Sequence, residues 1–157
     1  TTDSFVTSKL AHYRLLPYAM PGYLQQHPAI QSVADLAGHR WIDYVDDLLF
    51  TDQQVSLRKW LPAARPFLRS TSVIAQLQAV RSGLGIAMLP CFLASEEKQL
   101  VPILAHEVDI TRNFWLVAPA ERRELARIQA LWDYLRQVVD ANSDFLMGSS
   151  AKVTWLP

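Results

Sequence analysis

Three consecutive hydroxyl side chains, those of Ser70, Thr71 and Ser72, lie between an expected strand and an expected helix. The first backbone N–H groups of a helix have no partner inside it, and together with the helix dipole they favour an anion such as a carboxylate. Ser and Thr are also the usual residues that cap the start of a helix. We therefore interpret the triplet either as a helix cap or as an anion-binding site, and the two roles are compatible.

A second group of candidate ligand contacts follows the ends of the expected strands. In open α/β sheets the ligand crevice lies beyond the carboxyl ends of the strands. Met20 and Pro21 follow the first expected strand, and Tyr44 and Asp46 follow the second. Phe114, on a later strand, is a candidate for the wall of such a crevice. Each position has a plainer alternative, because Met, Tyr and Phe commonly pack in a core and a loop Asp is commonly solvated.

The residue types that usually act in catalysis or bind metals are not arranged in any recognisable catalytic or metal-binding motif. No serine stands in a G-x-S-x-G motif, and Gly83-Leu84-Gly85 lacks the third glycine of a dinucleotide-binding loop. Cys91, the single cysteine, has no base near it in the sequence, so we interpret it as a small buried apolar residue in a protein of a reducing compartment. The histidines lack the spacing of metal ligands: His12, His27, His39 and His106. The sequence thus predicts no catalytic residue, no metal and no cofactor.

The composition is that of an ordinary globular protein. Half of the 157 residues are apolar and 19% are charged, which allows a buried core in one compact domain or in two small lobes. Basic and acidic residues number 15 each, so the net charge is zero and the chain as a whole is not expected to attract nucleic-acid phosphates. No apolar run approaches the roughly 18 residues that a membrane helix needs.

The spacing of apolar residues predicts strands that alternate with helices. The clearest helix of the first half follows the hydroxyl triplet, with apolar residues at positions 73, 74, 77 and 80 and with Gly83 just beyond its end. The run over residues 84–89 is almost wholly apolar, which favours a strand that is covered on both faces. A long amphipathic helix is expected over residues 121–140, and the tail from residue 142 carries no periodic signal.

The weaker elements complete the same alternation. Strands are expected at residues 9–19, 40–45, 67–70, 100–104 and 110–118, and shorter helices near residues 21–26, 33–38, 52–60 and 92–98. Such an order predicts βαβ units and a mostly parallel sheet covered by helices.

Three stretches of the chain resemble the effector-binding domain of LysR-type transcription regulators. They follow the family's order and spacing and together span nearly all of residues 9–139. The first resembles the family's crossover strand and the turn after it, the second is close to its "n-s...a...av.aGlGia.lP" pattern, and the third is similar to its return strand and final helix. Their sequences are HYRLLPYAMPGYLQQHPAIQSVADLAGHRWI, RSTSVIAQLQAVRSGLGIAMLP and TRNFWLVAPAERRELARIQALWDYLRQVV.

The resemblance implies a type II periplasmic-binding-protein fold, in which two Rossmann-like α/β lobes enclose a ligand cleft. Residues 17–106 would form the second lobe, residues 1–16 and 107–141 only the C-terminal parts of the first, and residues 142–157 a loose tail. The family's helix-turn-helix, its linker helix and the start of the first lobe have no counterpart here, and the chain opens with Thr1-Thr2-Asp3, so we expect it to be internal to a longer protein. An incomplete first lobe would leave an apolar stripe on the last helix, which favours self-association. The stripe consists of Leu131, Trp132, Leu135 and Val139.

The function that the resemblance implies is the sensing of a small molecule by a cytoplasmic, DNA-bound oligomer. The effector, often an acidic metabolite in this family, would bind between the lobes, where the triplet Ser70, Thr71 and Ser72 lines the cleft. DNA would be bound only through the helix-turn-helix that this chain lacks, and no membrane partner is expected. The alternative is a stand-alone solute-binding protein of the same fold, which the N-terminal region of the parent protein would distinguish. An enzyme on this fold is disfavoured because an acid–base pair is missing.

Overall fold

The computed structural model describes residues 4–45 and 57–157 and has the α/β class that the sequence predicts. Strands and helices alternate through its first two thirds, and the last third holds a long strand and a long helix. In chain order the elements are β1 (Phe5–Ala19), α1 (Pro21–Gln25), the 3-10 helix η1 (Val33–Gly38), β2 (Trp41–Asp43), α2 (Leu57–Trp60), β3 (Pro66–Arg69), α3 (Val73–Arg81), β4 (Ile86–Pro90), α4 (Cys91–Ala94), β5 (Val101–Pro102), β6 (Ile110–Pro119), the 3-10 helix η3 (Ala120–Arg122), α5 (Ala126–Ala141) and α6 (Ser143–Leu146).

The strands form one mixed sheet in the order β3-β2-β4-β1-β5, and β6 pairs with the outer half of β1. The strands β2, β3 and β4 are parallel, as their connections through α2 and α3 require. In contrast, β1 is antiparallel to β4, β5 and β6. The carboxyl ends of β2, β3 and β4 therefore meet at one edge of the sheet, and the carboxyl end of β1 lies at the opposite edge.

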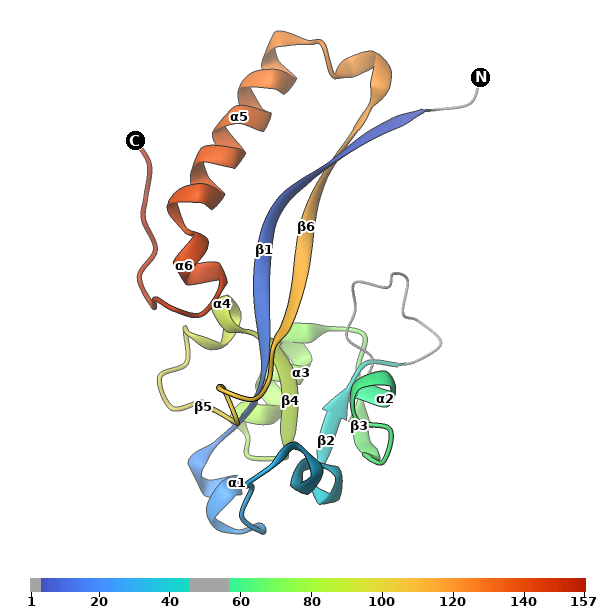
Figure 1. The fold of residues 1–157 in the computed structure, drawn as a ribbon, viewed down its shortest axis with the longest axis vertical. Helices are drawn as coiled ribbons and strands as arrows, with labels where there is room; N and C mark the ends of the chain where they lie inside the picture. Colours follow the sequence, from blue (N-terminus) through green and yellow to red (C-terminus); the bar gives the residue numbers. More distant parts are fainter. Residues whose placement is uncertain (1–3, 46–56) are drawn as a thin grey trace.

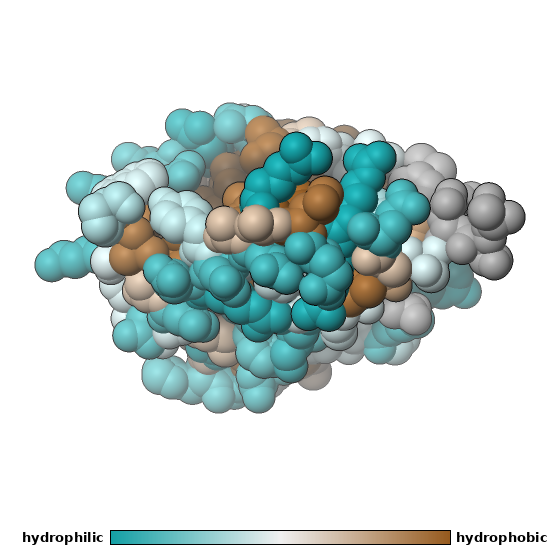
Figure 2. Space-filling model, turned by 90° about the horizontal axis from the view of Figure 1, so that it is seen from above, coloured by the Kyte–Doolittle hydropathy of each residue, from teal (hydrophilic) through white to brown (hydrophobic). Residues whose placement is uncertain are grey.

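The strand β1 belongs to two parts of the molecule. Its inner half, from Leu15 to Ala19, is buried and pairs with β4, whereas its outer half is partly exposed and pairs only with β6. This two-stranded ribbon extends away from the rest of the sheet, with α5 alongside it (Figure 1). Figure 2, seen from the end of the molecule where the ribbon lies, shows apolar side chains exposed among hydrophilic ones.

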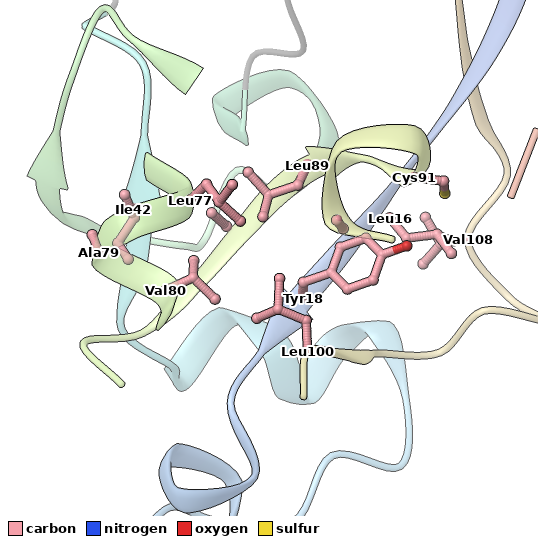
Figure 3. Close-up of a cluster of buried hydrophobic side chains, with 12 residues drawn as sticks. Leu16, Tyr18, Ile42, Leu77, Ala79, Val80, Leu89, Cys91, Leu100 and Val108 are labelled. Atoms are coloured by element: carbon pink, nitrogen blue, oxygen red, sulfur yellow. The ribbon is translucent and has the colours of Figure 1, made fainter. Parts of the chain in front are cut away.

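Two layers of helices bury the inner sheet. On one face, side chains of α3 pack against β1, β2 and β4 in the cluster shown in Figure 3, which includes Leu77, Val80 and Leu89. On the other face, α1, η1 and α2 contribute to a second cluster around Trp41. All residues of β4 are buried because both of its faces are covered, as its continuous apolar run predicts.

Two glycines between α3 and β4 are required by the backbone. Gly83 ends α3 with a φ of +73°, a left-handed conformation that costs glycine little, and its N–H donates to the carbonyl of Val80. At Gly85 a Cβ would lie 2.3 Å from the carbonyl oxygen of Arg40, so no side chain fits there. Gly83 thus ends the helix where the sequence predicts.

The last expected helix is divided in the structure. Residues 120–122 form η3, Leu125 is extended, and α5 begins only at Ala126. Glu121 and Glu124 offset the charges of Arg122 and Arg123 in this turn, so the helix dipole does not account for the later start. Of the four residues expected as an exposed stripe, Leu131 is 54% exposed, while the other three are partly buried; these are Trp132, Leu135 and Val139.

The C-terminal tail is attached to the body of the molecule, so the expectation of a loose tail is wrong. The buried side chain of Asn142 donates to the carbonyl oxygens of Val138 (2.8 Å) and Thr154 (3.0 Å), and its own Oδ1 accepts from the N–H of Thr154 (2.7 Å). Gly148, with a φ of +77°, packs so closely on Cys91 that a Cβ there would lie 2.9 Å from that of Cys91. Sequence periodicity could not reveal these contacts, because one amide side chain and one close approach of a glycine leave no periodic pattern.

Candidate functional site

The candidate site lies at the edge where β2, β3 and β4 end. The N–H of Ser70 donates to the carbonyl oxygen of Asp43 (2.9 Å), which ties the loop after β3 to the end of β2. Tyr44 follows Asp43 directly. The structure therefore brings the hydroxyl triplet and Tyr44 to one edge, at the start of α3.

The three hydroxyl residues have different local roles. Ser72 caps α3, because its Oγ accepts a hydrogen bond from the N–H of Ala75 (3.3 Å). The Oγ of Ser70 accepts from the N–H of Ser72 (3.1 Å), and the carbonyl oxygen of Ser70 accepts from the side chain of buried Gln76 (3.3 Å). Thr71 is exposed, and its hydroxyl has no hydrogen bond to any residue that the structure describes. Capping is thus assigned to Ser72, and the Thr71 hydroxyl is available to a ligand.

Aromatic side chains from three elements gather beside this edge. The rings of Tyr13 on β1 and Phe114 on β6 are stacked, with centroids 4.5 Å apart. Phe92 of α4 lies against both rings, at 5.6 Å from Tyr13 and 5.8 Å from Phe114. Burial raises the pKa of Tyr44, and electrostatic interactions with Tyr13 and Asp43 raise it further. Phe114 thus belongs to this aromatic cluster, which could form an apolar wall of a crevice.

The two tyrosine hydroxyls remain protonated over the physiological range. Burial also raises the pKa of Tyr13, and the positive charge of Arg112 opposes this only in part. A neutral phenol both donates and accepts a hydrogen bond. Tyr13 and Tyr44 can therefore orient a polar group of a ligand without adding negative charge.

Met20 and Pro21 lie apart from the other candidates. They follow the carboxyl end of β1, where Met20 is the N-cap of α1 and packs against the core. Because β1 is antiparallel to β4, with Tyr18 opposite Ala87 and Leu15 opposite Pro90, this end of β1 is at the far edge of the sheet from Tyr44. The expectation that all strand ends share one edge is thus wrong for β1. Asp46 lies outside the described residues.

Tyr13 and Phe92 were missed by the sequence reasoning. Tyr13 lies within a strand, whereas Phe92 lies in the short helix that begins directly after β4, two residues beyond the carboxyl end of that strand. Only the pairing of β1 with β6, which are about a hundred residues apart, places Tyr13 against Phe114. For Tyr13 the alternation of the strand at residues 9–19 was the available signal, and it does not distinguish a core residue from a ligand contact, whereas for Phe92 the end of the strand at residues 84–89 was a usable signal.

The remaining residues of interest are structural. Cys91 is 3% exposed and burial raises the pKa of its thiol, consistent with a small buried residue; Figure 3 shows the Tyr18 hydroxyl pointing toward it. His39 is buried against the Tyr23 hydroxyl, and the ring of His27 stacks on that of Tyr23. In residues 4–45 and 57–157, His, Cys, Asp and Glu form no group of three or more that could hold a metal ion. In the same residues no helix is long and apolar enough to cross a membrane.

Comparison with known proteins identifies a family and several similar solved structures. The family model described as the LysR substrate binding domain matches residues 1–140. The regulatory domain of CrgA, a LysR-type transcriptional regulator from Neisseria meningitidis, is 26% identical, with a TM-score of 0.68 over 87% of this chain and 70% of that domain. No curated protein sequence matches the chain significantly.

More distant structures share the fold. The effector domain of the transcriptional regulator AmpR of Pseudomonas aeruginosa is 19% identical, with a TM-score of 0.66 over 88% of this chain and 66% of that domain. The longer CrgA structure is 24% identical, with a TM-score of 0.69 over 87% of this chain and 48% of that one. The chain thus spans about half the length of that regulator.

Proposed function

Since this chain belongs to the LysR substrate binding domain family, we propose that it is the effector-sensing region of a LysR-type transcription regulator. The fold of the family is of the type II periplasmic-binding-protein kind, and the chain covers part of it. We assign residues 17–106 to the second lobe, residues 1–16 and 107–141 to the first, and residues 142–157 to the tail. The ligand would be a small acid held where these two parts meet.

The observation that carries this proposal is the convergence of two kinds of group at one edge. The second lobe contributes the free hydroxyl of Thr71 and the start of α3, which favour a carboxylate. The first lobe contributes Tyr13 and Phe114 from the ribbon, which offer an apolar wall. Polar groups that fix orientation beside apolar walls are the usual composition of a small-molecule site.

The activity of the whole regulator follows from the same assignment. DNA would be bound by a helix-turn-helix in the rest of the parent protein, and the effector would act on an oligomer in the cytoplasm. The region itself would do no chemistry, since relatives of this kind are regulators. A stand-alone solute-binding protein is not favoured, because the matched structures that name a role are transcriptional regulators.

The proposal is tested on the parent regulator. The protein is titrated calorimetrically with pyruvate, succinate and benzoate as probe acids, and the same acids are added to a mobility-shift assay with the promoter DNA of the parent gene. We expect at least one acid both to bind and to change the DNA complex. Binding of acids without any DNA binding by the parent would overturn the assignment to a regulator. DNA binding that no acid or related metabolite changes would overturn the assignment of this region as its sensor.

A further inference from the structure

A cavity of about 500 Å³ lies outside the candidate effector site, beside α2. The residues that line it come from α2, from the turn after α2, from β3 and from the end of β2. They are Asp43, Arg58, Pro62, Ala64, Arg65, Pro66 and Arg69. The volume falls within the roughly 300 to 1,000 Å³ that is typical of small-molecule sites.

The cavity and the start of α3 lie on opposite faces of the sheet. Trp41 and Ala64 belong to the core cluster on the α2 face, whereas Ile42 belongs to the cluster on the α3 face. Side chains of a strand alternate between faces, so Asp43 shares the face of Trp41. A ligand in this cavity would therefore not occupy the position proposed for the effector.

The lining carries an excess of positive charge. Three guanidinium groups surround the space, and Asp43 is the one acidic side chain among the described residues that line it. Counted over the described lining residues alone, three arginines and one aspartate give a formal charge of +2. A cavity of one charge sign with low-dielectric walls concentrates ions of the opposite sign.

Two of the arginines are placed to receive a ligand. The Nη1 of Arg65 donates to the carbonyl oxygens of Pro62 (2.9 Å) and Ala64 (3.0 Å), which fixes this guanidinium at the cavity wall. Its Nε and Nη2 have no hydrogen bond to a residue that the structure describes. Arg58, which is exposed, likewise has neither a hydrogen bond nor an ion pair within residues 4–45 and 57–157. These donors are not used to stabilise the described part of the fold.

We propose that this cavity is a second binding site, for a small multivalent oxyanion such as a phosphorylated or polycarboxylate metabolite. The planar fork of arginine matches the oxygens of phosphate and carboxylate groups and binds them through two parallel hydrogen bonds. Several guanidinium groups around one cavity fit an anion with several charges better than a single carboxylate. Arg58 and Arg65 are the residues that hold it.

The experiment uses the full chain, with pyrophosphate and citrate as probes and with sodium chloride at matched ionic strength as the reference. Isothermal titration gives the dissociation constant of each probe. We expect saturable binding of one probe or both, and the tighter of the two identifies phosphate or carboxylate as the preferred group. Arg58→Gln should weaken binding about tenfold or more, because it removes a charged hydrogen-bonding partner. Arg58→Lys, which keeps the charge but loses the fork, should give an intermediate loss.

Three controls decide the result. Arg127→Gln makes the same charge change on exposed α5 and should leave binding unchanged. Thr71→Val changes the proposed effector site and so reports whether a probe binds there instead of in this cavity. Circular dichroism checks that each variant is folded, and Arg65→Gln provides a second test should Arg58→Gln unfold. Binding no stronger than that of chloride, equal losses in Arg58→Gln and Arg127→Gln, or a loss confined to Thr71→Val would each overturn the proposal.

Discussion

Tyr13 and Phe114 are stacked across the ribbon, with ring centroids 4.5 Å apart and ring planes inclined by 25°. The two residues are not direct partners in the strand register, since Tyr13 lies opposite Arg112 and Phe114 lies opposite Ala11. The stack is therefore a diagonal cross-strand contact, which long aromatic side chains can reach. It places an aromatic face at the point where the ribbon meets the inner sheet.

Replacing Phe114 should weaken effector binding more than it weakens the fold. Phe114 is 39% exposed, so Phe114→Ala should lower the free energy of unfolding by about 1 kcal/mol, near the value of one aromatic pair. The affinity of the parent protein for its acid should fall several-fold, as measured by isothermal titration. Trp115→Ala is the matched control, because Trp115 is 48% exposed and points to the other face of the same strand. Equal effects of the two variants on affinity would remove Phe114 from the site.

Thr71 and Ser72 should separate ligand binding from helix capping. Thr71→Val keeps the shape of the side chain and should cost roughly 1 to 3 kcal/mol of ligand affinity. It should change stability little, since Ser72 is the residue that caps α3. Ser72→Ala should instead lower the unfolding free energy by about 1 kcal/mol. The measurements are titration with the effector and thermal unfolding of the ligand-free protein, and unchanged affinity in folded Thr71→Val would move the site elsewhere.

Stability should decrease as the pH falls below neutrality because of His39. The N–H of Arg40 donates to the Tyr23 hydroxyl oxygen (3.0 Å), and the same hydroxyl makes a hydrogen bond with Nδ1 of buried His39 (3.0 Å). Burial lowers the pKa of His39, and His27 nearby lowers it further, while the backbone of Pro28 and Asp35 act in the opposite direction. The unfolded chain, with the ordinary histidine pKa of about 6.5, binds the proton first.

The free energy of unfolding should therefore be constant above about pH 7 and fall from about pH 6.5 downward. Urea unfolding at pH 5.5, 6.5 and 7.5 measures this dependence. His39→Gln should reduce the slope, whatever its effect on absolute stability, and His12→Gln at an exposed position should not. The pKa of Asp35 is lowered as well, by hydrogen bonds from the backbone of Gln31 and Ser32, but its effect on stability comes at lower pH. An identical slope in His39→Gln would assign the dependence to other groups.

The tail should detach when Asn142 loses its amide. Asn142→Ala removes three hydrogen bonds and should lower the unfolding free energy by about 1 to 3 kcal/mol. Cleavage by trypsin after Lys152, near the attached Thr154, should become faster. Gln137→Ala, at an exposed position of α5, is the control. Cleavage at the same rate in both variants would show that other contacts hold the tail.

The chain should self-associate through the exposed face of its ribbon. Phe5, Trp115 and Val117 lie on one face of the paired strands and are all exposed. Trp115→Glu should therefore shift the chain toward monomer in sedimentation velocity. Trp155→Glu changes an even more exposed tryptophan in the tail and should have no such effect. A stable monomer of the unmodified chain at high concentration would contradict this prediction.

Local patterns predicted local structure well, and they failed where distant strands determine the outcome. The helix α3 was predicted because its apolar spacing, its cap and Gly83 agree, and β4 because a run buried on both faces has no polar alternation. The direction of β1 could not be predicted, because it depends on pairing with β4 some seventy residues later. Because the direction of β1 was unknown, Met20 and Pro21 were expected at the same edge of the sheet as Tyr44, which is wrong. The pairing of β1 with β6 was also unknown, so the position of Tyr13 beside Phe114 could not be predicted.

Because β1 is one continuous strand, the ribbon cannot rotate without turning about the segment near Leu15. There Leu15 pairs with Pro90 on one side and with Ile110 on the other, so the position is fixed from both directions. The ten residue steps from Leu15 to Phe5 extend over roughly 33 Å at the rise of a strand. A rotation of about 5° at Leu15 would displace the end of the ribbon by about 3 Å, which exceeds the helix shifts of about 1–2 Å that occur in regulatory transitions. A small change of packing around Tyr13, two residues from Leu15, would therefore move the far end of the ribbon more than it moves the inner sheet.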